Sequence, residues 1–410
     1  MSVRARPASH GSGDGAVLEA PLTVGMVAGE SSGDQLGEAL ITALRAQIPG
    51  VRCVGVAGPK MIAAGCEPWA SIEELSVMGL AEVLGHLPRL LRLRAALLDR
   101  FTAERPDVFV GIDYPEFNLS LAKRLKARGL RTVQYVSPQV WAWRQGRVRT
   151  IGKACDLILC VLPFETEFYT RHGVRAVFVG HPLADRIPLQ VDQAGARRDL
   201  GLDPDAPIVA LLPGSRMDEV ERLGPDFAAA AAWIAQRRPQ IQFVAPMASA
   251  RVRAAFERQV SAAAGAPAIA VFDGQSHKVL AAADAAIVAS GTATLETLLT
   301  GRPMVVAYRM SPVTAFVLRT LGMVKVPYFS QPNLLVGRAL VPEFLQEAVS
   351  GSALGAALLE QIHSREHVSE LEREFRAVHE ALRLGGAARA AAAIIECARS
   401  SRLSAAGGVS

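Results

Sequence analysis

The sequence lacks several features that would place it in a common class of protein. Its five cysteines form no C-x-x-C pair and no cluster with histidine, so no metal site is expected, and their odd number and scatter fit a reducing cytosol. Aromatic residues make up only 6% of the chain and the basic residues behind its net charge of +5 are dispersed, which argues against nucleic-acid binding. No G-x-G-x-x-G follows a strand-like run, so a nicotinamide dinucleotide is not expected.

Long apolar runs are also missing. No uninterrupted run reaches the ~18–20 residues that a membrane-spanning helix needs. Residues 1–20 contain no apolar segment of signal-peptide length. We therefore expect a soluble protein, or one that binds at most to a membrane surface. Residues 1–20 and 399–410 are predicted to be disordered.

What the sequence does contain is a regular alternation of strand-like runs and helical patterns. This alternation predicts βαβ crossovers, and hence an α/β protein with parallel sheets covered by helices on both faces. The predicted strands are residues 22–28, 51–57, 106–112, 131–136, 157–162, 176–179, 208–212, 242–246, 268–272, 285–289 and 304–308.

The alternation stops once and then restarts, which predicts two domains. The interruption is a stretch rich in proline and charge at residues 186–205, interpreted as a linker. A Rossmann-like domain is predicted on each side of it, over residues 21–185 and 206–365. Alanine-rich helices are expected over residues 366–398.

The stretch ADAAIVASGTATLE, residues 283–296, joins a strand to a helix through Ser290, Gly291 and Thr292. The first turn of a helix has unpaired N–H groups and a partial positive charge, so it attracts phosphate, and glycine lets an anion approach the backbone. Glu296, one turn further on, is placed to reach a ribose diol. The alternative is an ordinary N-cap, in which a hydroxyl bonds the first amides.

Because ligands of open α/β sheets bind beyond the carboxyl ends of the strands, other strand ends are also candidate sites. GESSGD begins directly after the first strand, with Gly29, Glu30, Ser32, Gly33 and Asp34. Its acidic pair disfavours a free phosphate, so a hydroxyl-rich ligand such as a sugar is the favoured partner. A tight structural turn is the alternative.

Asp113 follows the strand PDVFVGI and is a candidate general base. Its alternative role is to cap the helix that begins near Phe117.

PGSR ends the first strand of the second half, and its Gly214 and Ser215 amides and its Arg216 guanidinium suit a diphosphate. A structural turn is the alternative. Asn333, in the loop SQPNLLVGR, is a candidate ligand of a sugar or phosphate, or else a turn former.

The segment HLPRLLRLRAALLDRF, residues 86–101, predicts an amphipathic helix preceded by the apolar run 76–87. Such a helix usually packs on its sheet. The alternative is a surface that contacts anionic lipid, with arginines near the head-group phosphates. The residues expected at this surface are Met78, Leu80, Leu84, Leu90, Leu91, Arg92 and Arg94.

Eight motifs occur in the order GESSGD, GIDYPEFN, SPQVWAWR, VGHPLAD, LLPGSR, ASGTATLE, VAYRMSP and QPNLLVGR. From about Leu22 to Cys397 the chain closely resembles the lipid-A-disaccharide synthases, a family of inverting glycosyltransferases. The resemblance implies a GT-B fold, in which two Rossmann-like domains face each other across a cleft. It also implies Asp113 as the catalytic aspartate, and Arg216, Asn333 and the 290–296 segment at the UDP end of the donor.

The implied reaction condenses UDP-2,3-diacylglucosamine with 2,3-diacylglucosamine 1-phosphate (lipid X), giving a β-1,6-linked disaccharide 1-phosphate and UDP. The implied location is cytoplasmic, at an anionic inner-membrane surface, and the resemblance also suggests a homodimer. No cofactor is expected. No metal is expected either, because the Asp203-Pro204-Asp205 triplet lies in the linker rather than at a strand's carboxyl end. The alternatives are an isomerase like the UDP-N-acetylglucosamine 2-epimerases and a non-catalytic binding module.

Overall fold

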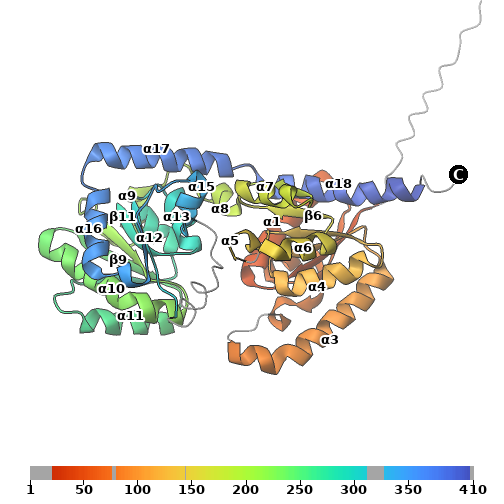
Figure 1. The fold of residues 1–410 in the computed structure, drawn as a ribbon, viewed down its shortest axis with the longest axis horizontal. Helices are drawn as coiled ribbons and strands as arrows, with labels where there is room; N and C mark the ends of the chain where they lie inside the picture. The colour runs from red at the N-terminus through yellow and green to blue at the C-terminus, as the bar shows by residue number, and fades with distance from the viewer. Residues whose placement is uncertain (1–20, 76–79, 144, 312–326, 407–410) are drawn as a thin grey trace, which may run out of the picture.

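The computed structural model describes residues 21–75, 80–143, 145–311 and 327–406, of which 80–87, 142–143 and 401–406 are described by their backbone alone. Two lobes lie side by side, each a parallel sheet with helices around it (Figure 1). The predicted disorder of residues 1–20 and the predicted position of Met78 fall outside the described residues.

The first lobe is built on a seven-stranded parallel sheet in the order β3-β2-β1-β4-β5-β6-β7. Its central strands are continuous apolar runs because helices cover both of their faces. The strands are β1 Thr23–Ala28, β2 Arg52–Ala57, β3 Cys66–Ser71, β4 Val108–Ile112, β5 Arg131–Tyr135, β6 Leu157–Cys160 and β7 Ala176–Phe178.

The second lobe repeats this plan with a six-stranded sheet in the order β10-β9-β8-β11-β12-β13. Its strands are β8 Ile208–Leu212, β9 Gln242–Met247, β10 Ile269–Asp273, β11 Ala285–Ala289, β12 Met304–Tyr308 and β13 Glu343–Leu345.

The helices of the first lobe connect its strands. They are α1 Ser31–Gln47, α2 Pro59–Ala63, α3 Leu80–Glu104, α4 Pro115–Lys126, α5 Val140–Trp143, α6 Val148–Ala154 and α7 Pro163–Arg171, with 3-10 turns at Ile72–Glu74 and Gln145–Arg147.

From the crossing between the lobes to the end of the chain, the helices are α8 Pro182–Arg186, α9 Gln193–Asp199, α10 Met217–Arg237, α11 Ala250–Ala262, α12 Ser276–Ala282, α13 Thr292–Leu299, α15 Gln331–Val336, α16 Gly351–Gln361, α17 Arg365–Leu382 and α18 Gly386–Ala406, with a 3-10 turn at Gln346–Ala348. No helix among the described residues is long and apolar enough to cross a membrane.

All eleven predicted strands are present, with each end within two residues of its expected position. The two strands that the sequence did not indicate are both short or polar. β3 (CEPWAS) is a half-exposed edge strand with a glutamate and a proline in its interior, and β13 has only three residues.

The strand order reverses beside the first strand of each sheet. β1 lies between β2 and β4, and β8 lies between β9 and β11. The loops after β1 and β4 therefore leave the sheet in opposite directions and open a crevice, as do the loops after β8 and β11. These four loops, with the first residues of the helices that follow them, hold Gly29–Asp34, Asp113, PGSR and Ser290–Thr292, so both crevices carry predicted site residues.

The C-terminal helices complete the two lobes instead of forming a segment of their own. Leu371 and Phe375 of α17 belong to the core of the second lobe. Ile394 and Cys397 of α18 belong to the core of the first lobe, and Gln47 Nε2 donates to the Ala388 carbonyl at 2.9 Å. α17 and α18 accordingly run along opposite lobes (Figure 1).

The chain crosses between the lobes at two adjacent places. Asp185, just before the predicted linker, accepts hydrogen bonds from Gly385 N at 2.9 Å and Gly386 N at 2.6 Å, at the start of α18. Close by, His181 N donates to the Leu382 carbonyl at 2.9 Å. The carboxylate of Asp185 thus ties the outgoing crossing to the returning one.

Two predicted boundaries are wrong. The proposed linker contains α9, whose Arg197 donates to the Ala282 carbonyl and pairs with Asp284 at 2.8 Å, so this part belongs to the second lobe. The tail predicted to be disordered from residue 399 is helical as far as Ala406.

Candidate active site

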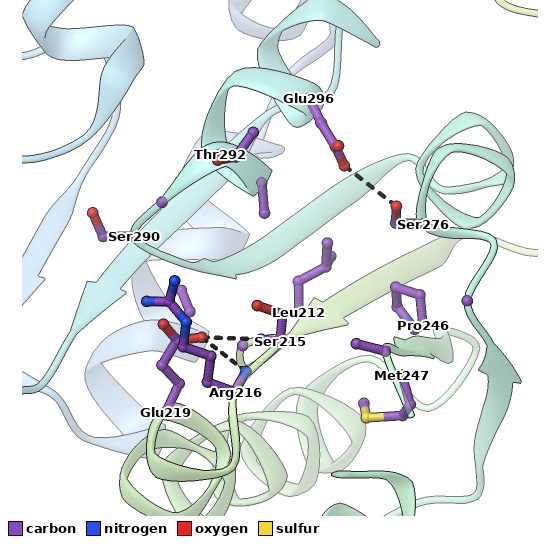
Figure 2. Close-up of a pocket in the computed structure, with 16 residues that line it drawn as sticks. Leu212, Ser215, Arg216, Glu219, Pro246, Met247, Ser276, Ser290, Thr292 and Glu296 are labelled. Carbon is purple, nitrogen blue, oxygen red and sulfur yellow. Dashed lines mark hydrogen bonds between the residues drawn. The ribbon is translucent and has the colours of Figure 1, made fainter. Parts of the chain in front are cut away.

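A cavity of about 480 Å³ lies in the crevice of the second lobe, beyond the carboxyl ends of β8, β9 and β11 (Figure 2). It gathers seven of the eight residues predicted at the UDP end of the donor. Its lining is Leu212, Gly214, Ser215, Arg216, Glu219, Pro246, Met247, Ala248, Gly274, Ser276, Ala289, Ser290, Gly291, Thr292, Ala293 and Glu296.

The start of α13 opens into this cavity without a side-chain cap. Ser290 Oγ instead donates to the Phe329 carbonyl at 3.0 Å, so the capping alternative is not what this chain adopts. Gly291 has φ 152° and ψ −159°, a conformation that is essentially confined to glycine. Thr294 N donates to the Gly291 carbonyl at 3.1 Å, so the amides of Thr292 and Ala293 at the very start of α13 are the ones left for an anion, where the helix dipole favours negative charge.

The PGSR turn offers an anion less than its sequence suggested. Glu219 Oε2 accepts from the backbone amides of both Ser215 (3.0 Å) and Arg216 (3.2 Å). Those amides are already bonded, and Gly214 is required because a Cβ there would lie 2.4 Å from Glu219 Cβ. The exposed Arg216 guanidinium is the donor that this turn presents to the cavity.

Glu296 lines the far side of the same cavity. Its carboxylate accepts from Ser276 Oγ at 3.3 Å (Figure 2) and lies 4.0 Å from His277 Nε2. Sequence reasoning missed Ser276, Met247 and Gly274 of this cavity, although Met247 is the last residue of β9 and the other two follow β10, so all three obey the same strand-end rule.

In the first lobe, Asp113 lies directly after β4 and accepts from Ser32 Oγ at 3.2 Å. Asp113 and Tyr114 both adopt left-handed backbone conformations, with φ of 53° and 41°. The N-cap position of α4 is held by Tyr114, and no side chain caps the helix. Asp113 is therefore not the helix cap that was its alternative role.

The backbone of Asp113 is held at both ends. Its N–H donates to the Tyr135 carbonyl at 2.9 Å. Its carbonyl accepts from Asn118 Nδ2 and Gln134 Nε2, each at 2.9 Å. Both amide side chains are buried. A left-handed residue other than glycine persists only where its surroundings enforce it, and these bonds do so here.

The two crevices face a common cleft. A larger cavity of about 980 Å³ is lined by Gln35, on α1 after β1, and by residues of α8, α9 and α12. Since α12 follows β10, the carboxyl ends of both sheets border the same space.

Most of the chain matches one family. The family model for lipid-A-disaccharide synthetase covers residues 24–395, and a lipid-A-disaccharide synthase from Serratia proteamaculans is 50% identical over 379 residues, which are 92% of this chain and 99% of that protein. The chain belongs to the lipid-A-disaccharide synthase family. The members of this family are glycosyltransferases of lipid A biosynthesis, as the eight motifs indicated.

The fold is that of GT-B glycosyltransferases and related epimerases, as expected. The calicheamicin glycosyltransferase superposes with a TM-score of 0.55 at 18% identity, over 92% of this chain and 98% of that one. A protein described as a UDP-N-acetylglucosamine 2-epimerase from Listeria monocytogenes gives 0.62 at 14% identity, over 92% and 95%. At these identities the likeness shows the fold alone.

Within this synthase fold, the contacts that Asp34 makes are structural. Its buried carboxylate accepts from Lys60 N and Met61 N, each at 3.0 Å, and so satisfies the first amides of α2. Gly29 is needed for close packing, because a Cβ there would lie 2.5 Å from the Tyr114 ring. Of the predicted set, Glu30 and Ser32 are exposed. Buried Gly33 lies between them and Asp34.

Asn333 is also structural. Its side chain is buried, donates to the Val341 carbonyl (2.9 Å) and to Glu343 (2.8 Å), and accepts from the amides of Leu340 and Val341. These bonds use its hydrogen-bonding capacity, and Asn333 does not line the 480 Å³ cavity of the second lobe. It holds α15, whose Leu334 packs against the core of the first lobe.

The predicted lipid-contact residues of helix α3 differ in exposure, some being packed against the core and others exposed. Leu90 packs against the core of the first lobe, whereas Leu91 is 45% exposed and Arg92 is exposed. Arg94 is half-buried, its Nε has no hydrogen-bond partner, and burial, with a smaller effect from Arg124, lowers its pKa. Leu80 and Leu84 lie in α3 but are described by backbone only. Among the described residues, no group of three or more His, Cys, Asp or Glu side chains is placed to hold a metal ion.

Proposed function

We propose that this chain condenses UDP-2,3-diacylglucosamine with 2,3-diacylglucosamine 1-phosphate, forming a β-1,6-linked disaccharide 1-phosphate and releasing UDP. The single observation that carries the proposal is the pairing of the two crevices. One presents the Asp113 carboxylate, and the other presents an uncapped helix start with an exposed arginine. The substrates are inferred from family membership. The pairing of the crevices provides a carboxylate to activate the acceptor and a positively charged site for the departing UDP.

Asp113 acts as general base. It takes the proton from the 6-hydroxyl of the acceptor as that oxygen attacks the anomeric carbon of the donor, on the face opposite UDP. A single displacement inverts the configuration and needs one carboxylate. The left-handed backbone of Asp113 and its Ser32 contact support this role, because they present the carboxylate at a strand end without a capping partner. A positioned base contributes ~10²–10⁴-fold.

The departing diphosphate is stabilised in the second lobe. The first amides of α13 and the Arg216 guanidinium supply donors and positive charge where negative charge develops. Glu296 is assigned to the ribose hydroxyls, with Ser276 orienting its carboxylate.

The deciding experiment is an assay with both acylated substrates, with the anomeric configuration of the product determined by NMR. Asp113→Asn should cut turnover at least ~100-fold and leave UDP affinity within about twofold of wild type. Glu116→Gln, an exposed carboxylate in the next turn, is the matched control and should stay near wild type. Near-normal turnover of Asp113→Asn would remove the base assignment. Consumption of the UDP-sugar without any acceptor would favour an epimerase instead.

We also propose that the exposed surface of α3 meets an anionic membrane on the cytoplasmic side, since both substrates carry acyl chains. Exposed Leu91 beside Arg92 supports this, with the leucine entering the interface and the arginine near head groups. Leu91→Glu with Arg92→Glu should abolish flotation with phosphatidylglycerol vesicles. Ile62→Glu, an equally exposed apolar residue in α2, is the control. Unchanged flotation of the α3 variant would contradict the assignment.

A homodimer that exchanges the C-terminal region is proposed as well. The contacts that α18 makes with the first lobe of its own chain can equally be made to a second copy. Sedimentation of a single monomeric species at micromolar concentration would contradict this proposal.

A further inference from the structure

The large cavity between the lobes is lined by basic side chains that the mechanism above does not use. Arg186 comes from α8 at the crossing between the lobes, His277 and Lys278 come from α12, and Arg198 comes from α9. Gln35 faces them from the first turns of α1 in the other lobe. The cavity is therefore built by both lobes, and its volume of about 980 Å³ accommodates a sugar phosphate.

The charge of Arg186 is not neutralised by any described carboxylate. Its Nη2 lies 3.5 Å from His277 Nε2, which is an imidazole rather than an acid. The carboxylate of the preceding residue, Asp185, is occupied by two backbone amides. The other acids of the cavity are also engaged, because Asp192 accepts from Gly195 N at 2.8 Å and Asp199 pairs with Lys278 at 3.0 Å. An unpaired guanidinium beside a histidine is suited to a phosphate group.

This basic cavity adjoins both reacting groups. Gln35 follows Ser32 by three residues, or about 4.5 Å along the helix axis, and Ser32 contacts the Asp113 carboxylate. On the other side, His277 lies 4.0 Å from Glu296, which lines the nucleotide cavity. A ligand in the basic cavity is thus a neighbour of both the base and the donor site.

The chemistry of the acceptor fits this position. In a pyranose, C1 and C5 flank the ring oxygen, so a phosphate on C1 and the hydroxymethyl group on C5 share one edge of the ring. The acyl groups on C2 and C3 lie on the opposite edge. When the 6-hydroxyl meets Asp113, the phosphate is therefore held near the reacting edge, towards Gln35 and Arg186, and the acyl chains point away from this basic cavity.

We propose that this cavity binds the 1-phosphate of the acceptor, with Arg186 as its main ligand and His277, Lys278 and Gln35 as further donors. The site makes the enzyme select a phosphorylated acceptor over a neutral one and fixes the 6-hydroxyl at the base. This inference rests on the proposed function for the identity of the acceptor.

The test compares two acceptors, 2,3-diacylglucosamine with and without its 1-phosphate, in wild type and in Arg186→Gln. Hydrogen bonds to a charged group are strong enough that Arg186→Gln should reduce the preference for the phosphorylated acceptor ~10- to 100-fold in kcat/KM. The KM for the UDP-sugar should stay within about twofold. Arg251→Gln, an exposed arginine of α11 away from the cavity, should keep the wild-type preference.

A binding measurement separates this inference from the proposed function. Calorimetry with water-soluble glucosamine 1-phosphate and with glucosamine reads the site without turnover, and wild type should bind the phosphate ester more tightly in a manner that depends on Arg186. If wild type forms no disaccharide but still shows Arg186-dependent binding, the proposed function fails and the anion site stands. If turnover is normal and Arg186→Gln keeps the full preference, or if wild type shows no preference, the anion site is overturned. Absence of both turnover and binding overturns both proposals.

Discussion

Replacing Gln134 with methionine tests whether the backbone strain at Asp113 serves catalysis. Gln134 is buried in β5, and its Nε2 lies 2.9 Å from the Asp113 carbonyl and 3.3 Å from those of Tyr135 and Val136. Methionine is similar in volume and removes only the amide. Each left-handed residue at Asp113 and Tyr114 costs about 1–3 kcal/mol, so the turn relaxes if its anchors weaken.

The stability and the activity of Gln134→Met should change by different amounts. The net value of one such bond is about 1 kcal/mol, and Gln134 Oε1 has no partner, so its removal offsets part of the loss. We therefore expect a destabilisation of at most about 1 kcal/mol. The Asp113 carbonyl keeps Asn118, yet a shift of ~1 Å at a reacting group costs up to ~10²-fold in rate. We therefore expect kcat to fall ~10- to 100-fold, with UDP affinity unchanged.

Thr132→Val on the same strand is the matched control. Thr132 is also buried, and its Oγ1 donates to the Ala154 carbonyl at 2.9 Å, away from the cleft. Thr132→Val should lose a similar amount of stability in urea unfolding and retain wild-type kcat. If Gln134→Met matches this control in both stability and kcat, the amide is only structural and the account of a held catalytic turn is refuted.

Four further predictions follow from the site and its supports. Asp34→Ala should destabilise the protein by about 2–3 kcal/mol in urea unfolding, because it uncaps α2, and should leave UDP affinity unchanged; lost activity at full stability would restore a substrate role. Gly291→Ala should weaken UDP binding at least ~10-fold in calorimetry, because its backbone conformation is closed to alanine; equal affinity would remove α13 from the diphosphate site. Burial raises the pKa of Glu165 to about 7, so between pH ~4.5 and 7 the folded state binds more protons than the unfolded state. As the pH rises through this range, wild type should therefore lose up to roughly 3 kcal/mol of stability that Glu165→Gln keeps, and parallel stability profiles of the two proteins would contradict this. Activity should survive EDTA, and loss restored by magnesium would refute metal independence.

The fold and the location of the site were predictable because their signals are local. A strand buried on both faces is a continuous apolar run, and the carboxyl end of such a run is where a ligand binds. These two rules predict from the sequence alone that Asp113 and Ser290–Thr292 lie at the ligand-binding edges of their sheets. The sheet order then showed why those loops matter, since each lies where the strand order reverses.

What sequence reasoning missed depends on contacts between distant or competing groups. The Asp34 carboxylate accepts from two amides of α2 that lie 26 and 27 residues further along the chain. No local sequence pattern indicates a contact over that separation. PGSR has the sequence of a phosphate-binding loop. However, the amides of Ser215 and Arg216 donate to Glu219 of the following helix α10, so they are not free for a phosphate. The motif around Asn333 predicts a ligand of a sugar or phosphate, but the groups that hydrogen-bond its side chain lie seven to ten residues further along the chain.

The position of α18 has a consequence for how the chain is made. Its residues fill part of the core beside strands formed by the first 160 residues. During synthesis the first lobe therefore lacks a piece of its interior until α18 has left the ribosome, whereas the second lobe has its core helices once α17 has emerged. The lobe made first is the lobe finished last. A nascent chain arrested before residue 386 should therefore expose to chaperones the apolar surface that α18 covers, and removing α18 should damage the lobe that carries Asp113.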